Sequence, residues 1–287
     1  MSVWFARYSP CIRRCGLAGA AALAMIHIGC MKVITEVYVK RDGSGTVTET
    51  MYIDRHLVEL AEALGDRRGD VAPKPDKIKG IKRAQSMGEG VTYVSSEAVT
   101  SSNNDPGIRT VFAFDDIRTL RVGVEPESLA AEMQAVGGMQ KSVERKPLTF
   151  AFSTEPVPTL KVRGLRQDNA LGDTSGRRPQ KSSGTDSVAQ TSAKGTGMLE
   201  MLRGFGIWIR VRVEGAITET NALHVNSTND GVTLLKIDFA RILDQAEDPS
   251  RLLGLDKIDN LASAQAMLMD VPGVIIQPAE ELTIAFK

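Results

Sequence analysis

Residues that could carry catalysis or hold a metal ion are few in this sequence, and their spacing is unfavourable. The three histidines, His27, His56 and His224, lie too far apart along the chain to form a metal-ligand motif. No serine stands in a G-x-S-x-G elbow, and no glycine-rich stretch has the spacing of a nucleotide-binding loop. We therefore predict no catalytic residue, no metal site and no cofactor.

One acidic pair, Asp115–Asp116, has residue types suited to acid–base or metal chemistry. The pair follows an apolar, strand-like run and precedes residues 117–120, a position at which an acidic side chain caps the first turn of a helix. Capping is therefore the favoured role. A periplasmic hydrolase that uses His56, His224 or this pair is the least favoured function.

All three cysteines lie near the start of the chain, at positions 11, 15 and 30. Residues 1–14 contain three arginines and no acidic residue, and residues 16–31 then run without a charge. A basic start followed by an apolar stretch is the layout of a secretory signal peptide. As a helix, with about 1.5 Å per residue, this stretch falls short of the roughly 30 Å hydrocarbon core, so a permanent spanning helix is the second choice.

Gly29–Cys30, directly after the apolar stretch, resembles the lipobox of bacterial lipoproteins. The resemblance implies cleavage between Gly29 and Cys30 and diacylation of Cys30, and two acyl chains anchor a protein stably where one does not. An alternative cut after Ala24 satisfies a small-x-small site and releases a soluble protein. Under either cut the mature chain keeps at most one cysteine, so it has no internal disulfide.

The composition is that of an ordinary globular protein, with 42% hydrophobic and 24% charged residues among 287. These values exclude collagen-like, coiled-coil and fully disordered chains. The 35 basic and 35 acidic residues cancel, which is a poor match to a nucleic-acid binder. Removal of residues 1–29 takes away three arginines and no acidic residue, so the mature body carries a net charge of about minus three.

Periodicity predicts an α+β fold of antiparallel sheet with packed helices. Alternating apolar residues predict strands at 32–40, 46–53, 90–99, 108–114, 148–153, 159–163, 207–214, 222–227, 231–237 and 281–286. Helical spacing and caps predict helices at 54–65, 76–87, 115–120, 198–203, 238–243 and 256–270. We expect the second of these helices to expose a solvated basic face made of Lys74, Lys77, Lys79, Lys82 and Arg83.

The clearest alternation of all lies at residues 207–214. Its isoleucines and valines face one way, and Trp208, Arg210 and Arg212 face the other. Arginine binds phosphate through two nitrogens, and tryptophan favours membrane interfaces. These three residues are therefore candidate contacts for an anionic lipid headgroup or a partner, beside the alternative of an ordinary solvated sheet face.

The chain divides by composition into a signal peptide at 1–29, an α+β region at 30–163, an insertion at 164–197 and a second α+β region at 198–287. The insertion has only three large apolar residues and no aromatic one, so it cannot offset its ordering entropy and is predicted to be disordered. One alternative joins the two α+β regions in a single domain.

Several motifs together resemble a group of uncharacterised bacterial envelope lipoproteins, the LppM-like secreted domains. They are GC at 29–30, MKVxxEVYV at 31–39, DGSGTV at 42–47, GVTYV at 90–94, FxFDDIxxL at 112–120, GxITETN at 215–221 and DF at 238–239. The resemblance implies an exported, membrane-attached α+β domain, with lipid binding in a cavity between sheet and helices. No catalytic residue carries over.

Taken together, the sequence predicts an exported lipoprotein that is anchored through Cys30 at the periplasmic or outer face of the bacterial envelope. We expect a non-catalytic binding or scaffolding module, whose partners are the membrane, a lipid or an envelope protein, and not nucleic acid. The alternative is a lipid carrier with an apolar cavity.

Overall fold

The computed structural model describes residues 31–63, 73–123, 147–164, 203–245 and 271–287. The predicted signal peptide, Cys30, nearly all of the predicted insertion and the predicted helix at 256–270 lie outside the described residues. So does the predicted helix at 198–203, except for its last residue.

Strands predominate over helices in the described residues, which agrees with the predicted α+β class at this coarse level. The first half of the chain forms β1 (Met31–Val39), β2 (Gly45–Ile53), α2 (Arg55–Ala63), α3 (Lys77–Met87), β3 (Thr92–Thr100), β4 (Pro106–Phe114), the 3₁₀ turn η1 (Ile117–Thr119) and β5 (Arg121–Val122). The second half forms β6 (Leu148–Ser153), β7 (Thr159–Arg163), β8 (Gly206–Val213), β9 (Ile217–Thr220), β10 (Gly231–Asp238), α6 (Phe239–Gln245), β11 (Val274–Ile276) and β12 (Glu281–Phe286).

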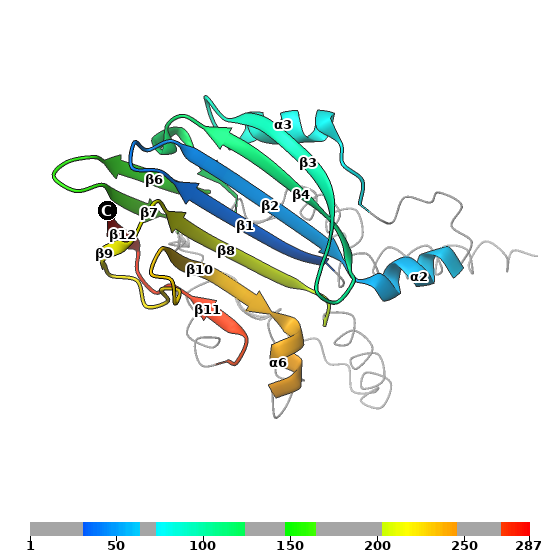
Figure 1. Cartoon of the computed structure of the whole chain (residues 1–287). Coiled ribbons are helices and arrows are strands. Elements are labelled where there is room, and N and C mark those ends of the chain that lie inside the picture. Colours follow the sequence, from blue (N-terminus) through cyan, green and yellow to red (C-terminus); the bar gives the residue numbers. More distant parts are fainter. Residues whose placement is uncertain (1–30, 64–72, 124–146, 165–202, 246–270) are drawn as a thin grey trace, which may run out of the picture.

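The strands form two sheets (Figure 1). The large sheet has seven strands in the order β11-β10-β8-β1-β2-β4-β3, and the small sheet has five in the order β5-β6-β7-β12-β9. Strands from both halves of the chain meet in each sheet, because β1 pairs with β8 in the large sheet and β7 pairs with β12 in the small one.

The prediction of a purely antiparallel sheet is wrong at one central pairing. β8 runs parallel to β1, with Val33 opposite Ile207 and Val39 opposite Val213, whereas the other described pairings are antiparallel. Alternation of apolar residues fixes which face a side chain occupies, but it carries no information on strand direction. A parallel neighbour needs only a connection long enough to cross the sheet, and the long chain between these strands provides it.

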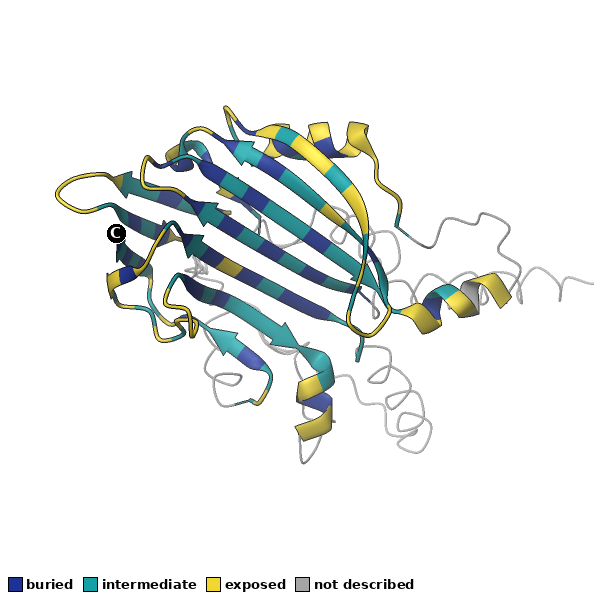
Figure 2. Cartoon of the chain, viewed as in Figure 1, coloured by how far each residue is buried: buried dark blue, intermediate teal, exposed yellow. Residues whose placement is uncertain are grey.

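Alternate side chains of each strand point to opposite faces of the large sheet, and the burial bands along β1 and β8 follow this period (Figure 2). The inner face is the one that packs against the small sheet. Its core contains Val37, Val47, Phe112, Phe114 and Val211 from the large sheet and Leu148, Phe150, Leu160, Leu282 and Phe286 from the small sheet. The outer face is the opposite one, and it carries Glu36 and Trp208.

Helix α3 lies against β3 on the inner face, where its Ala84 and Met87 join the core. Asp76 caps it by accepting hydrogen bonds from the backbone N–H groups of Ile78 and Lys79. Arg83 reaches Glu49 of β2, with 2.7 Å between Nη2 and Oε1. Arg83 therefore belongs to the packed side of the helix, and its predicted place in a solvated basic face is wrong.

The predicted turn at Asp42–Gly43 is confirmed. Asp42 Oδ1 accepts hydrogen bonds from both the backbone N–H and the hydroxyl of Ser44. Gly43 has a φ of +85°, and a Cβ there would lie 2.8 Å from the ring of Phe152, so the turn and the contact with the small sheet both require glycine.

One local prediction, the strand at 222–227, is corrected. Residues 222–227 form a loop and not a strand, with one isolated β-bridge from Val225. The reason is a turn in which Asn226 Oδ1 accepts hydrogen bonds from the backbone N–H groups of Asp230 and Gly231. The strand in this region is β9, slightly earlier, and it pairs with β12. The predicted cap from the acidic pair is confirmed, and Asp116 supplies it at the turn η1.

Candidate functional site

Trp208, Arg210 and Arg212 share the outer face of β8, as the alternation predicts. In the large sheet β8 lies between β1 and β10, so side chains from three strands surround this row. The two flanking strands supply charged residues that the sequence analysis did not associate with it.

Two lysines flank the indole ring of Trp208. Lys32 Nζ lies 4.0 Å from the ring centroid, and Lys236 Nζ lies 4.5 Å from it. Lys236 pairs directly with Trp208 across the β8–β10 pairing. On the β1 side Trp208 pairs with Ile34, and Lys32 lies two residues before Ile34 on the same strand. Both ammonium groups are therefore within cation–π range of one ring. We call Lys32, Trp208 and Lys236 the indole cluster.

The electrostatic environment of the indole cluster is cationic. Burial lowers the pKa of Lys236 below its usual value, and the nearby charges of Arg241 and Lys32 lower the same pKa further, against the opposing effect of Asp238. Within the described residues, neither lysine has a carboxylate within ion-pairing distance. Trp208 Nε1 is shielded from solvent and has no hydrogen-bond acceptor there.

The two arginines of the row are engaged with acids. Arg210 Nε lies 2.5 Å from Glu36 Oε2, and Arg212 forms an ion pair with Asp230. The hydrogen bond that Arg212 donates to Asp230 is the largest influence that raises the pKa of Arg212. Hydrogen bonds from Thr228, Arg212 and Asn226 together hold the pKa of Asp230 far below its usual value. Arg210 and Arg212 are thus compensated within the sheet, while the lysines of the indole cluster are not.

The indole cluster lies near one end of the large sheet, which we call the proximal end. There β1 and β8 begin and β2 and β10 finish, since Met31 pairs with Ile53 and Gly206 pairs with both Lys32 and Asp238. In Figure 1, α2 and α6 follow from this end, whereas the small sheet lies toward the other end. Cys30 is bonded to Met31, the first residue of β1, so the predicted attachment site is two residues from Lys32.

The residues considered for hydrolysis are dispersed. The side chain of His56 is 92% exposed on α2 at the proximal end, 3.6 Å from Glu59. Asp115 and Asp116 follow Phe114, which pairs with Gly45 at the far end of β2, roughly 27 Å away at 3.3–3.4 Å per residue. His224 lies in the loop beside β10, where its carbonyl accepts from Thr233. No described element brings these groups together.

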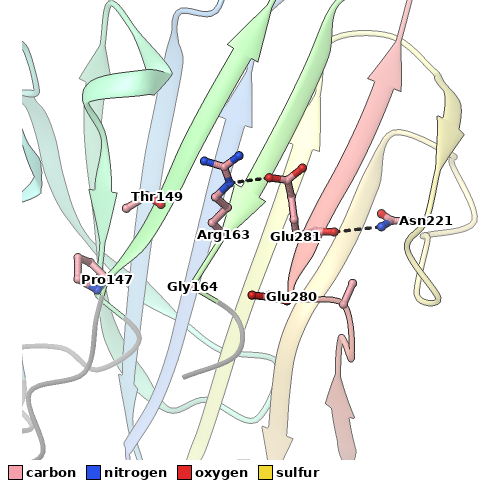
Figure 3. Close-up of a pocket in the computed structure, with 8 residues that line it drawn as sticks. Pro147, Thr149, Arg163, Gly164, Asn221, Glu280 and Glu281 are labelled. Atoms are coloured by element: carbon pink, nitrogen blue, oxygen red, sulfur yellow. Dashed lines mark hydrogen bonds and ion pairs between the residues drawn. The ribbon is translucent and has the colours of Figure 1, made fainter. Parts of the chain in front are cut away.

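A pocket of about 830 Å³ opens on the outer side of the small sheet (Figure 3). The described residues that line it are Pro147, Thr149, Arg163, Gly164, Asn221, Ala279, Glu280 and Glu281. Glu281 lies 2.9 Å from Lys161 Nζ and also accepts a hydrogen bond from Arg163, and these two cations hold its pKa below the usual value. Lys161 and Arg163 are balanced by two acids, Glu281 and Glu280, so the pocket offers little preference for a charged ligand.

Two features of the described residues bear on ligands and membranes. They contain no group of three His, Cys, Asp or Glu side chains placed to hold a metal ion. Their helices are too short or too polar to span a bilayer.

Comparisons with known proteins give one structural likeness. No protein-family model matches the chain, and no curated protein sequence matches it. A search of solved structures finds a similarity to the folded domain of LppM from Mycobacterium tuberculosis, solved by NMR, with 11% identity and a TM-score of 0.33. The alignment covers 90% of this chain and 90% of that one.

Proposed function

We propose that the chain is an exported lipoprotein, anchored through acyl chains on Cys30, whose α+β body serves as a non-catalytic binding or scaffolding module at the cell envelope. One observation carries the proposal. Cys30 directly precedes β1, an interior strand of the large sheet, so lipids on this residue would hold the body against the membrane by its proximal end without a spacer.

The cysteine content supports the anchoring role. A cysteine that begins the mature chain is the only one left after cleavage at Gly29–Cys30, so it has no partner for an internal disulfide. Acylation gives this thiol a purpose, and the anchor places the body at the periplasmic or outer face of the envelope. The partners of such a body are the membrane itself, a lipid or an envelope protein.

The absence of a catalytic role is part of the proposal, and the dispersal of the candidate groups supports it. General acid–base chemistry needs its groups within hydrogen-bond reach of one substrate. His56 and Asp116 stand at opposite ends of the β2–β4 pairing, and Asp116 is occupied as a cap.

Lipid carriage is the weaker alternative. A carrier needs an apolar cavity, but the facing surfaces of the two sheets are filled by side chains such as Phe114, Leu160 and Phe286, which are almost fully buried. The pocket on the small sheet has three charged residues, Arg163, Glu280 and Glu281, in its lining. We therefore place ligand contacts on the surface of the body.

The anchor is tested by metabolic labelling of the full chain with radioactive palmitate in a bacterial host. We expect label on the wild type and on the Cys15→Ser variant, because Cys15 leaves with the signal peptide. We expect Cys30→Ser to lose the label and to leave the membrane fraction in a detergent-partition assay. Label or membrane association that persists in Cys30→Ser would overturn the proposal.

A further inference from the structure

Three cations gather at the proximal end without matching acids. They are Lys32, Lys236 and Arg241, and none of them has a carboxylate within 4.0 Å among the described residues. Lys32 and Arg241 are both close enough to lower the pKa of Lys236 by repulsion. Asp238 alone opposes them, so the group keeps a net positive charge.

Two other groups of basic residues in the described part of the chain are compensated by acids. The basic groups at the small-sheet pocket are paired with Glu281. Arg210 and Arg212 are paired with Glu36 and Asp230. The proximal end differs from these two regions, because its three cations have no carboxylate within ion-pairing distance among the described residues.

We propose that Lys32 and Lys236, which flank the indole of Trp208, form together with the nearby Arg241 a contact site for the phosphate groups of anionic membrane lipids. The proposal rests on the lipid anchor proposed above, because acyl chains on Cys30 would bring this end of the sheet to the bilayer surface. It adds what the anchor does not supply, namely a preference for lipid charge.

The residue types suit that ligand. A phosphate between Lys32 and Lys236 would relieve their mutual repulsion, and strongly hydrated ammonium groups act as point charges toward phosphate. The ammonium groups of both lysines lie over the indole, with Nζ 4.0 and 4.5 Å from the ring centroid, so one aromatic ring holds the two cations close together. Tryptophan is itself enriched at the level of lipid headgroups.

The position in the fold also suits it. Lys32 is two residues from Cys30, and a basic patch beside a lipid anchor is the second signal that strengthens membrane attachment. Anionic surfaces attract such residues only within about a Debye length, roughly 8 Å at physiological salt, so the cations must lie next to the anchor to act.

Trp208 provides a direct reporter. The chain has two tryptophans, Trp4 and Trp208, and cleavage before Cys30 removes Trp4. The mature chain that carries Cys30→Ser has no acyl chains, so its fluorescence reports contact by the site alone. It is mixed with vesicles of phosphatidylcholine, with vesicles that also contain phosphatidylglycerol, and with inorganic phosphate, and nitroxide-labelled headgroups serve as quenchers.

We expect quenching of Trp208 by the phosphatidylglycerol vesicles and little by phosphatidylcholine alone. Lys32→Gln and Lys236→Gln should each weaken vesicle binding about fivefold, which is the typical contribution of one basic residue at an anionic surface. Lys236→Arg keeps the charge, so it should bind vesicles as the wild type does. Lys40→Gln is the matched control. Lys40 is exposed at the far end of β1, and its loss should leave binding unchanged.

Three results would overturn the proposal: equal quenching by both kinds of vesicle, an equal loss in Lys40→Gln, or saturation by inorganic phosphate at concentrations that abolish vesicle binding. The last result would assign the site to a free anion and not to a membrane. Failure here together with palmitate label on Cys30 would remove the headgroup site and leave the anchor intact. Thermal unfolding of each variant confirms that its fold is retained.

Discussion

Replacement of Phe286 by alanine tests the claim that the last strand of the chain closes the core. Phe286 is fully buried at the end of β12, which lies between β7 and β9 in the small sheet. Its ring centroid is 6.3 Å from that of Phe152 on β6. The side chain belongs to the apolar core that joins the two sheets.

The expected cost follows from this burial. Loss of a buried phenylalanine side chain removes its transfer free energy and leaves a cavity, which together cost about 3–5 kcal/mol. A protein of ordinary stability has about 5–15 kcal/mol in total, so the variant should lose a large part of it. At about 2–4 °C per kcal/mol, the midpoint of thermal unfolding should fall by roughly 6–20 °C.

Urea unfolding followed by circular dichroism measures the change in the free energy of unfolding. Lys287→Ala is the matched control: the exposed side chain is removed, while the two backbone hydrogen bonds between Lys287 and Ala216 remain. We expect the control to change stability by less than about 0.5 kcal/mol. A loss below about 1 kcal/mol in Phe286→Ala would refute the placement of β12 in the core.

Three further predictions concern stability. Asp230→Asn should destabilise the protein near neutral pH by about 1–2 kcal/mol. Hydrogen bonds from Thr228, Arg212 and Asn226 depress the pKa of Asp230 in the folded state below 3.8. In urea unfolding at a series of pH values, the difference in stability from wild type should therefore vanish as the pH falls through that depressed pKa. Gly45→Ala should lower the thermal midpoint sharply, because its Cβ would lie 1.9 Å from a backbone oxygen of the neighbouring strand; an unchanged midpoint would contradict this register. Arg83→Met should cost about 1–3 kcal/mol in urea unfolding, because it strands a half-buried Glu49, and the double variant with Glu49→Gln should recover part of the loss.

Local structure in this protein was largely predictable from the sequence. The turn at Asp42–Gly43, the helix capped by Asp76 and the alternation around Trp208 all depend on neighbouring residues only. Side-chain capping and the two-residue period are short-range effects, so they can be read without knowledge of the rest of the chain.

Long-range pairing was not predictable in the same way. The residues of β1 and β8 do not indicate that the two strands run parallel. The strand expected at 222–227 is also replaced, because β9 lies earlier in the chain and pairs with β12. In that region Asn226 and Asp230 form a side-chain network that outweighs the strand propensity of the neighbouring residues.

The candidate site shows the same division. The face shared by Trp208, Arg210 and Arg212 follows from periodicity, but the lysines that flank the indole come from β1 and β10. Their proximity depends on the strand order, which a single sequence does not reveal. The arginines that stood out in the sequence are neutralised by acids from neighbouring elements, so the uncompensated charge lies elsewhere.

The proposed anchor is tested most directly by the intact mass of the protein extracted from bacterial membranes. The anchor requires a chain that begins at Cys30 and carries the added mass of a diacylglyceryl group on that residue. A chain that begins at Met25 after a cut behind Ala24, or one that begins at Cys30 with an unmodified thiol, would contradict it.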